Sequence, residues 1–278
     1  MAAVVFEGKK FADGLSLKLE KRAFRLKERL GRNPKICSLV MGNDEASAVY
    51  LKAKAKAGEK MGIDFEVVRT ETEAELKLLI QNLNSSEEVD GVMVQLPLVR
   101  GDGSVVVGEN RTATLDGIAR VKDVDCMTSG NLEELRAKGK GLMPATVRAV
   151  MTVLIEAERV LEHKGMAVVV VGGEGGVGRP LAWVLARGGY KLTSMDKHDF
   201  DAGLISKAEV VVSCTGSSGL IGGEMVREGV VAIDVGFPRG DFEFESVIAK
   251  ASFITPVPGG VGPVTVACLF WNLIELVE

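Results

Sequence analysis

Residues 167–180 read AVVVVGGEGGVGRP, an apolar run followed by five glycines around one glutamate, and then a proline. A short continuous valine run that ends in glycine is typical of a strand buried on both faces, as in a parallel sheet. Glycines directly after such a strand permit a tight turn and a close approach of the backbone to another group. The stretch therefore restricts the chain to an α/β fold in which strands alternate with helices.

The same alternation occurs on both sides of this stretch. Upstream, helices and strands are expected in turn over residues 9–30, 35–42, 45–61, 64–69, 71–84 and 89–96, before a glycine-rich loop over 97–111. Downstream of a helix that begins near Thr146, strands are expected within 166–173, 191–196, 208–216, 230–236 and 252–257, with helices from 177, at 222–228 and at 264–278. Strands separated by helices predict βαβ units and largely parallel sheets.

The two series of strands predict two domains. We place the boundary near 143–145, which gives an N-terminal domain over 1–143 and a Rossmann-like domain over 144–263. At 278 residues the chain is long enough for two domains, each with its own core.

Composition excludes several classes of function. A net charge of −4 disfavours nucleic acid or an anionic membrane as a partner. With only His163 and His198 as histidines, we expect no metal site. The four cysteines, Cys37, Cys126, Cys214 and Cys268, are widely spaced, and from the sequence we expect neither a signal peptide nor a membrane-spanning stretch. We therefore expect a soluble protein with reduced thiols in the cytoplasm.

The glycines over 173–178 satisfy the pattern G-x-G-x-x-G directly after a strand and at the start of a helix. In that context the pattern predicts a dinucleotide site, because the helix N-terminus attracts the pyrophosphate. The alternative is an ordinary glycine-rich turn. The predicted cofactor contacts are Gly172, Gly173, Glu174, Gly175, Gly176, Val177 and Gly178, with Thr215 and Gly216 after a later strand.

Asp196 ends the second strand of this unit, where such folds place the group that reads the ribose. A carboxylate there accepts hydrogen bonds from a 2′-hydroxyl and repels a 2′-phosphate, and Glu174 adds negative charge nearby. The sequence therefore favours NAD over NADP. Lys197, a further expected cofactor contact, and Arg179 act in the opposite direction, and Asp196 alternatively caps the following turn.

The helix over 45–61 carries Ser47, Tyr50 and Lys54 at positions i, i+3 and i+7, so the three share one face. A tyrosine and a lysine one turn apart can supply an aromatic platform, a proton relay and a cation. By itself this lysine- and alanine-rich segment is more typical of a solvated helix than of a functional one.

Four motifs in a fixed order strengthen the functional interpretation. The segment from Met41-Gly42 to Gly62-Ile63, with Ala46-Ser47, Tyr50, Lys54 and Lys56, resembles V-G-x-x-x-A-S-x-x-Y-v-x-x-K-x-K-x-x-x-x-x-G-I. It is followed by DGVMVQLPL (90–98), KDVD (122–125) and ITPVPGGVGPVT (254–265). All four are similar to signatures of the bifunctional methylenetetrahydrofolate dehydrogenase/cyclohydrolase family, and the resemblance covers nearly the whole chain.

The resemblance implies two domains that face each other across a cleft, with folate on the first and NAD(P) on the second. It further implies that the final helix packs back on the first domain, that the protein is a homodimer, and that it serves one-carbon metabolism and purine biosynthesis. Methylenetetrahydrofolate would be oxidised to the methenyl form, which is then hydrolysed to 10-formyltetrahydrofolate.

Carried onto matching positions, the resemblance makes Lys54 the principal catalytic residue, with Tyr50 beside the folate ring and Gln95 positioning Lys54 and water. Asp125 would bind the pterin edge, and Ser47 would support the motif. Pro258, Gly259 and Gly260 would line the place where nicotinamide and folate meet, or would form only a rigid turn.

Several positions depart from the family pattern. The usual G-R-S of the cofactor loop is Gly172-Gly173-Glu174, and the usual His-Ser-type pair after the next strand is Asp196-Lys197. The acids at these positions again favour NAD. The glycine after K-D-V-D is Cys126, and P-C-T-P is replaced by PATV (144–147).

Three alternatives remain at this stage. The first is a family member that has kept only the dehydrogenase activity. The second is another two-domain dehydrogenase, of the amino-acid or shikimate type, which would not need the VQLPL or PVPGGVGP strings. The third is a non-catalytic dinucleotide-binding regulator, which would not need Tyr50, Lys54, Gln95 and Asp125.

Overall fold

The computed structural model describes residues 3–42 and 45–278. The chain divides into two compact units, each with its own parallel sheet, and the predicted α/β class with two domains is confirmed. Unit 1 comprises Met1–Ala12, Leu135–Gly141 and Thr146–Thr265, and unit 2 comprises Asp13–Glu134, Leu142–Ala145 and Val266–Glu278. The limits 1–143 and 144–263 remain a prediction.

Unit 1 is built on a six-stranded parallel sheet in the order β1-β9-β8-β7-β5-β6. Its strands are β1 (Val4–Val5), β5 (Ala167–Val171), β6 (Lys191–Met195), β7 (Val210–Ser213), β8 (Val230–Asp234) and β9 (Ala251–Ile254). The chain leaves β5 for β6 on one side and continues with β7 on the other. The carboxyl ends of β5 and β7 therefore form a topological switch point, where open α/β sheets bind ligands.

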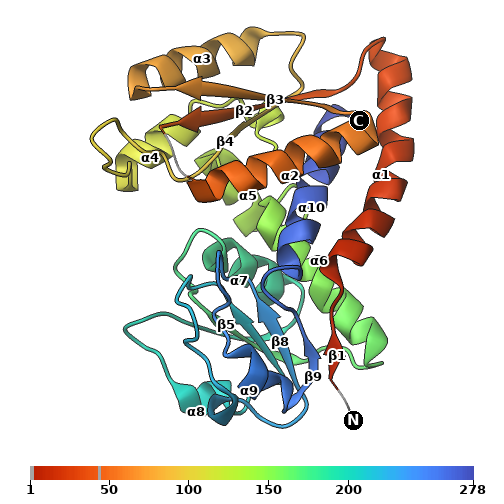
Figure 1. Ribbon diagram of the computed structural model, residues 1–278, viewed down its shortest axis with the longest axis vertical. Helices are drawn as coiled ribbons and strands as arrows, with labels where there is room; N and C mark the ends of the chain where they lie inside the picture. The colour runs from red at the N-terminus through yellow and green to blue at the C-terminus, as the bar shows by residue number, and fades with distance from the viewer. Residues whose placement is uncertain (1–2, 43–44) are drawn as a thin grey trace. The chain divides into compact units, whose positions relative to one another are not determined.

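Helices cover the sheet of unit 1 (Figure 1). They are α6 (Ala145–Val160), α7 (Gly178–Arg187), the short α8 (Ala202–Ile205) and α9 (Phe244–Ile248), with the 3₁₀ helix η2 (Gly223–Met225). Side chains of alternate strand residues such as Val169 and Val211 form one core with Ile205, Phe242 and Val247. This apolar burial, rather than helix propensity, stabilises the short helices.

Unit 2 contains a three-stranded parallel sheet in the order β3-β2-β4. The strands are β2 (Lys35–Met41), β3 (Asp64–Thr70) and β4 (Gly91–Val94), connected by α2 (Glu45–Met61) and α3 (Glu73–Ser85). Figure 1 shows α3 over one face of this sheet and α2 over the other. Unit 2 also contains α4 (Gly108–Leu115) and η1 (Arg120–Lys122), while α1 (Gly8–Leu30), α5 (Ser129–Lys138) and α10 (Val261–Val277) each have residues in both units.

Successive side chains of a strand point to opposite faces of the sheet, so alternate residues contact α3 on one face and α2 on the other. Leu39 and Val92 belong to the core that also contains Leu76 and Ile80 of α3. Met93, one residue on, points to the opposite face, where its sulfur lies 3.8 Å from Lys54 on α2. The alternation along β4 therefore leaves one face of the sheet to α2, and the side of α2 that packs on this face includes Lys54.

The boundaries differ from the sequence predictions in a few places. Helix α3 begins at Glu73, not 71, because Thr72 caps it: the Thr72 hydroxyl accepts the N–H of Glu75 at 3.2 Å, and the Glu75 carboxylate accepts the N–H of Thr72 at 3.3 Å. The loop expected over 97–111 was wrong at its end, since α4 begins at Gly108. The helix expected over 222–228 is only one 3₁₀ turn, η2.

Among the described residues, no helix is both long and apolar enough to cross a membrane. Within residues 3–42 and 45–278, no three or more His, Cys, Asp or Glu side chains are grouped so that they could hold a metal ion. Cys37, Cys126 and Cys268 are buried as free thiols, and Cys214 is partly buried.

Candidate functional site

Lys54 is a buried cation. It lies on α2 with 8% of its surface exposed, and its Nζ donates a hydrogen bond to Oε1 of Gln95 at 2.9 Å. Burial lowers the pKa of Lys54, and the carboxylate of Asp125 acts in the opposite direction. A buried lysine whose pKa is lowered can be a neutral amine closer to physiological pH, and a neutral amine can accept a proton.

Gln95 follows β4 directly, at the carboxyl edge of the sheet of unit 2. Its Nε2 donates to the carbonyl of Leu96 at 2.9 Å, which leaves Oε1 to face Lys54. The hydroxyl of Ser47, in the first turn of α2, donates to the same Leu96 carbonyl at 3.3 Å. Ser47, Gln95 and Lys54, three residues expected from the sequence, are therefore brought together around one strand end.

Asp125 lies in the segment that follows an isolated parallel bridge between Val92 and Asp123. Its Oδ1 accepts the N–H of Ala145 at 3.2 Å. Burial raises the pKa of Asp125, while Lys54 and the N–H of Ala145 oppose the rise. A carboxyl group and an amine thus influence each other electrostatically inside unit 2.

Asn272 of α10 fixes the segments on both sides of Asp125, and sequence reasoning missed it. Its Nδ2 donates to the carbonyls of Val124 and Met143, each at 2.8 Å. Asn272 is fully buried. Nothing in the local pattern of an apolar terminal helix indicates this role, because the two acceptors lie more than a hundred residues upstream, as the separations of 148 and 129 show.

Cys126 occupies the position where the family motif has glycine, and its φ is +53°. This left-handed conformation favours glycine, so a cysteine there holds a strained backbone directly after Asp125. Its thiol is buried and contacts the carbonyl of Leu142 at 3.5 Å.

Tyr50, on the same helix as Lys54, is half-buried, and burial raises its pKa.

The glycine loop of unit 1 lies at the switch point, directly after β5. Its first residue, Gly172, has φ +89°, and a Cβ there would lie 2.8 Å from the carbonyl oxygen of Cys214. A Cβ at Gly173 would lie 1.9 Å from the Ser194 hydroxyl, and one at Gly178 would lie 2.1 Å from the Gly172 oxygen. At Gly172 and Gly178 the obstacle is backbone, so only glycine fits there, whereas at Gly173 the Ser194 hydroxyl would have to rotate away. The resulting cradle at the start of α7 suits a dinucleotide pyrophosphate.

Two glycines of the loop offer a matched test of this packing. Gly178→Ala forces a Cβ onto the Gly172 carbonyl, whereas a Cβ at Gly176 would meet nothing within 4 Å. We expect Gly178→Ala to destabilise the fold by about 2 kcal/mol and to lower Tm by about 5 °C, with weaker dinucleotide binding. Gly176→Ala should keep the wild-type Tm, which is the property that the packing argument predicts. Thermal melts and calorimetry on the two variants measure the difference, and equal behaviour would contradict the packing argument.

Asp196 contacts the glycine loop. Its carboxylate accepts the N–H of Glu174 at 3.0 Å and the N–H of Lys197 at 2.8 Å. These hydrogen bonds, that of Lys197 first, lower the pKa of Asp196, so the group is ionised at neutral pH. The hydrogen bond from Lys197 is also the one expected if Asp196 caps the turn that follows β6. The same bonds place a negative charge beside Glu174, next to the predicted cofactor site.

Pro258, Gly259 and Gly260 form a close turn before α10, within unit 1. Gly259 has φ +106°, and a Cβ at Gly260 would lie 2.5 Å from the carbonyl oxygen of Pro256. A Cβ at Gly8 would lie 1.9 Å from the oxygen of Gly260. This is the close backbone packing expected of a rigid turn.

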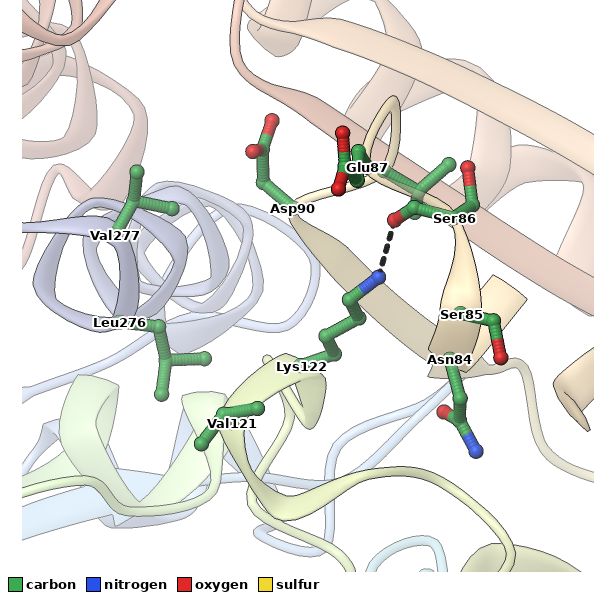
Figure 2. A pocket seen from close by; sticks show the side chains of 10 residues that line it. Asn84, Ser85, Ser86, Glu87, Asp90, Val121, Lys122, Leu276 and Val277 are labelled. Atoms are coloured by element: carbon green, nitrogen blue, oxygen red, sulfur yellow. Dashed lines mark hydrogen bonds between the residues drawn. The ribbon is translucent and has the colours of Figure 1, made fainter. Parts of the chain in front are cut away.

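Figure 2 shows a hollow of about 460 Å³ in unit 2. Lys122 of the KDVD motif lines it, and its Nζ donates to the carbonyls of Leu83 and Ser86 at 2.8 and 2.5 Å. Lys122 therefore caps the carboxyl end of α3. None of the residues that line the hollow is among the expected catalytic residues.

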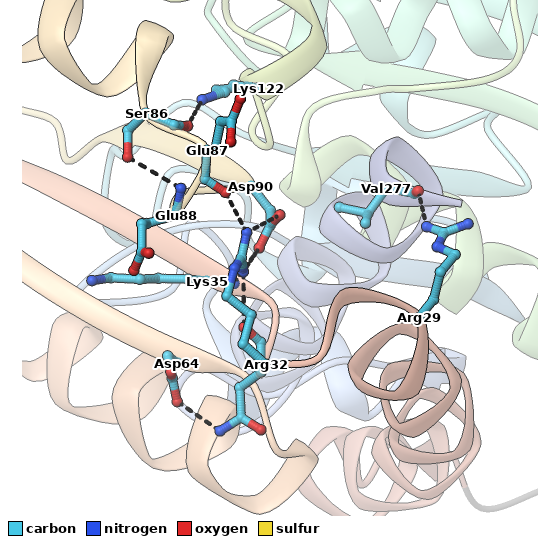
Figure 3. Close-up of polar contacts among 11 residues, drawn as sticks. Arg29, Arg32, Lys35, Asp64, Ser86, Glu87, Glu88, Asp90, Lys122 and Val277 are labelled. Carbon is cyan, nitrogen blue, oxygen red and sulfur yellow. Dashed lines mark hydrogen bonds and ion pairs between the residues drawn. The ribbon is translucent and has the colours of Figure 1, made fainter.

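Asp90, which also lines the hollow, forms a clamp with Arg32 (Figure 3). Its two carboxylate oxygens accept from the Arg32 guanidinium at 2.7 and 3.0 Å, and one also accepts the N–H of Lys35 at 2.8 Å. Lys35 begins β2 and Asp90 precedes β4, so the clamp lies at the amino edge of the sheet. Ligands of α/β sheets bind at the opposite, carboxyl edge, so we interpret the hollow as structural.

Unit 1 has the fold of a dinucleotide-binding domain, and unit 2 is an α/β unit with a buried lysine next to a partly buried amide and influenced by a carboxylate. These features define a two-domain oxidoreductase class. Residues 6–125 match the catalytic domain of tetrahydrofolate dehydrogenase/cyclohydrolase, and residues 144–278 match its NAD(P)-binding domain. The chain belongs to the tetrahydrofolate dehydrogenase/cyclohydrolase family, which confirms the resemblance found in the sequence.

Individual relatives cover the whole chain. The bifunctional protein FolD of Moorella thermoacetica is 37% identical over 286 residues, which cover 99% of each chain. The crystal structure of the bifunctional enzyme FolD from Campylobacter jejuni superposes with a TM-score of 0.89 at 33% identity, covering 99% of both chains. The Trypanosoma brucei enzyme, solved with NADP and an inhibitor, gives a TM-score of 0.87 at 30% identity, covering 100% of this chain and 98% of that one.

Proposed function

We propose that this protein oxidises 5,10-methylenetetrahydrofolate to 5,10-methenyltetrahydrofolate with NAD(P)⁺ and hydrolyses the product to 10-formyltetrahydrofolate. Membership of the family supports both activities. The observation that carries the proposal is the buried amine of Lys54, held 2.9 Å from the Gln95 amide and influenced by Asp125. The bound dinucleotide supplies the hydride acceptor, and all other chemistry falls to side chains of this chain.

In this proposal Lys54 moves protons during hydrolysis and orients the one-carbon unit. Gln95 fixes the Lys54 amine and positions the attacking water through its amide. Asp125 binds the pterin edge through hydrogen bonds that need a carboxylate. Tyr50 flanks the folate ring, and Ser47 supports the first turn of α2 through its bond to Leu96.

The cofactor contacts are proposed in unit 1. They are Gly172, Gly173, Glu174, Gly175, Gly176, Val177, Gly178, Asp196, Lys197, Thr215 and Gly216. Pro258, Gly259 and Gly260 are proposed as substrate-binding residues. We propose NAD as the preferred cofactor. The negative charges of Glu174 and Asp196, whose ionised state is supported by its two backbone hydrogen bonds, would repel a 2′-phosphate.

We also propose that the protein acts in the cytoplasm as a homodimer, within the one-carbon metabolism that supplies purine biosynthesis. Strand β6 is an edge of the unit 1 sheet, and Lys191 and Ser194 on it are exposed. An unpaired edge strand can pair with a second copy of the chain, which supports an interface there.

Hydrolysis of methenyltetrahydrofolate, supplied directly and without dinucleotide, tests the second activity by itself. We expect the protein to accelerate the disappearance of the methenyl absorbance. Absence of acceleration, in a protein that still oxidises methylenetetrahydrofolate, would favour a dehydrogenase without cyclohydrolase activity.

The pH dependence of this hydrolysis should depend on Asp125. Because burial lowers the pKa of Lys54, the rate should rise with pH along a limb below the ordinary lysine range. The Asp125 carboxylate raises the pKa of Lys54, so Asp125→Asn should lower it further and move the limb to lower pH. Rate profiles of kcat measure the limb. Asp116→Asn, an exposed carboxylate that accepts from Ser129, is the control and should leave the limb in place.

A further inference from the structure

We propose that Asp241 is a positioning residue of the dinucleotide site, and that its buried carboxylate fixes the turn after β7 against the glycine loop. The inference rests on the proposed function, because it assumes that unit 1 binds a dinucleotide. Asp241 lies in the connection between β8 and α9.

One oxygen of this carboxylate organises the whole turn. Oδ2 of Asp241 accepts from the Ser213 hydroxyl at 2.8 Å, the N–H of Thr215 at 2.7 Å and the Thr215 hydroxyl at 2.9 Å. The N–H of Gly216 is a fourth, longer donor at 3.3 Å. Asp241 is fully buried, so no water competes for these bonds. A single buried acceptor thus fixes Ser213, Thr215 and Gly216, at the end of β7 and in the turn after it.

Asp241 is itself held in place by a second buried carboxylate. Its N–H donates to Oδ1 of Asp234 at 3.0 Å, and the N–H of Phe242 donates to Oδ2 of Asp234 at 3.0 Å. The carbonyl of Asp241 accepts the N–H of Ile221 at 3.0 Å. Because both its backbone and its carboxylate are fixed, Asp241 acts as a rigid support rather than as a mobile side chain.

The supported turn is the wall against which the glycine loop packs. The N–H of Cys214 donates to the carbonyl of Val171 at 2.9 Å, directly before the loop. A Cβ at Gly172 would lie 2.8 Å from the Cys214 oxygen and 3.1 Å from the Thr215 nitrogen. The turn and the first glycine are therefore in contact at the switch point between β5 and β7. Displacing the turn would displace the predicted contacts Thr215 and Gly216, and the cradle beside them.

The second carboxylate oxygen of Asp241, Oδ1, suggests a variant that should keep the hydrogen bonds of Oδ2. Oδ1 of Asp241 is buried and has no hydrogen-bond partner among the described residues. A Cβ at Gly236 would lie 2.6 Å from it, so Oδ1 faces the backbone of that glycine. An asparagine can place its carbonyl oxygen at the Oδ2 position and its amide nitrogen at the Oδ1 position. Asp241→Asn can thus preserve all four bonds, whereas Asp241→Ala loses them.

The test compares Asp241→Ala, Asp241→Asn and Glu209→Ala. Glu209 is the matched control, because its carboxylate also accepts a backbone N–H, that of Ala167 at 2.7 Å, but at the amino end of β5. Calorimetric titration with NAD⁺ alone gives Kd, kinetics give the KM for each substrate, and thermal melts report folding. For Asp241→Ala we expect Kd and KM for NAD⁺ to rise about tenfold, with the KM for methylenetetrahydrofolate unchanged.

Asp241→Asn should restore NAD⁺ binding to within about threefold of wild type, and Glu209→Ala should stay within about twofold. If Asp241→Ala does not fold, Ser213→Ala removes one of the four donors from the same oxygen and should raise Kd about threefold. Wild-type Kd in a folded Asp241→Ala or Ser213→Ala protein would overturn the positioning role while leaving the proposed function intact. A wild-type protein that does not bind NAD⁺ or NADP⁺ would overturn both.

Discussion

Replacing Lys54 by methionine is expected to reduce the hydrolysis of methenyltetrahydrofolate by about 10³-fold, the scale of a lost general acid–base group. Methionine keeps the length and apolar stem of the side chain and removes only the amine that donates to Gln95. Oxidation of methylenetetrahydrofolate should fall less, by about 10- to 100-fold, because there the amine only orients the one-carbon unit. The two rates are measured separately, with methenyl and with methylene substrate.

The effect of Lys54→Met on stability has two opposing parts. Removing a buried amine whose pKa is lowered by burial favours folding, while Gln95 loses its hydrogen-bond donor, so we expect Tm to stay close to that of the wild type. Lys52→Met changes an exposed lysine of the same helix and should keep both rates within about twofold of wild type. Undiminished hydrolysis by Lys54→Met would exclude Lys54 as the catalytic group.

A second large effect is expected at the cofactor loop. The double variant Glu174→Ser/Asp196→Ser should raise the ratio of kcat/KM for NADP⁺ to that for NAD⁺ by about 30-fold. The variant removes two negative charges that would face a 2′-phosphate. In the wild-type protein the N–H groups of Glu174 and Lys197 donate to the Asp196 carboxylate, and serine at 196 still carries a hydroxyl oxygen that can accept from them.

The control removes the same charge elsewhere in unit 1. Glu228 and Glu245 are exposed and lie outside the glycine loop and its neighbouring strand ends, so Glu228→Ser/Glu245→Ser should leave the cofactor ratio unchanged. An unchanged ratio in the loop variant would mean that the ribose is bound elsewhere, or that Lys197 or Arg179 determines the preference.

The parts of the fold that the sequence predicts best are those with strong periodicity. The valine run of β5 and the glycines after it lie where expected, and Ser47 and Lys54 share a helix with the spacing expected of one face. Helix α4 was hidden, because its sequence, GENRTATL, is polar and begins at a glycine with φ +60°. A helix of this kind is stabilised by the packing of Leu115, which no local pattern shows.

Long-range polar contacts were equally hidden. Asp241 lies 26 residues after Thr215, in a stretch that is typical of a plain turn, and only the order of the strands brings it to the turn after β7. Asn272 holds the segments around Asp125 from the end of the chain. A single sequence shows which residue types are present, but pairings across separate βα units depend on topology, which motif spacing does not encode.

The central claim is that this chain oxidises methylenetetrahydrofolate with a dinucleotide, and that it favours NAD. The most direct test follows the oxidation of methylenetetrahydrofolate by absorbance, with NAD⁺ and NADP⁺ in parallel and at equal concentrations. We predict turnover with both dinucleotides and a higher kcat/KM with NAD⁺. A higher kcat/KM with NADP⁺ would contradict the assigned roles of Glu174 and Asp196, and no turnover with either would contradict the claim itself.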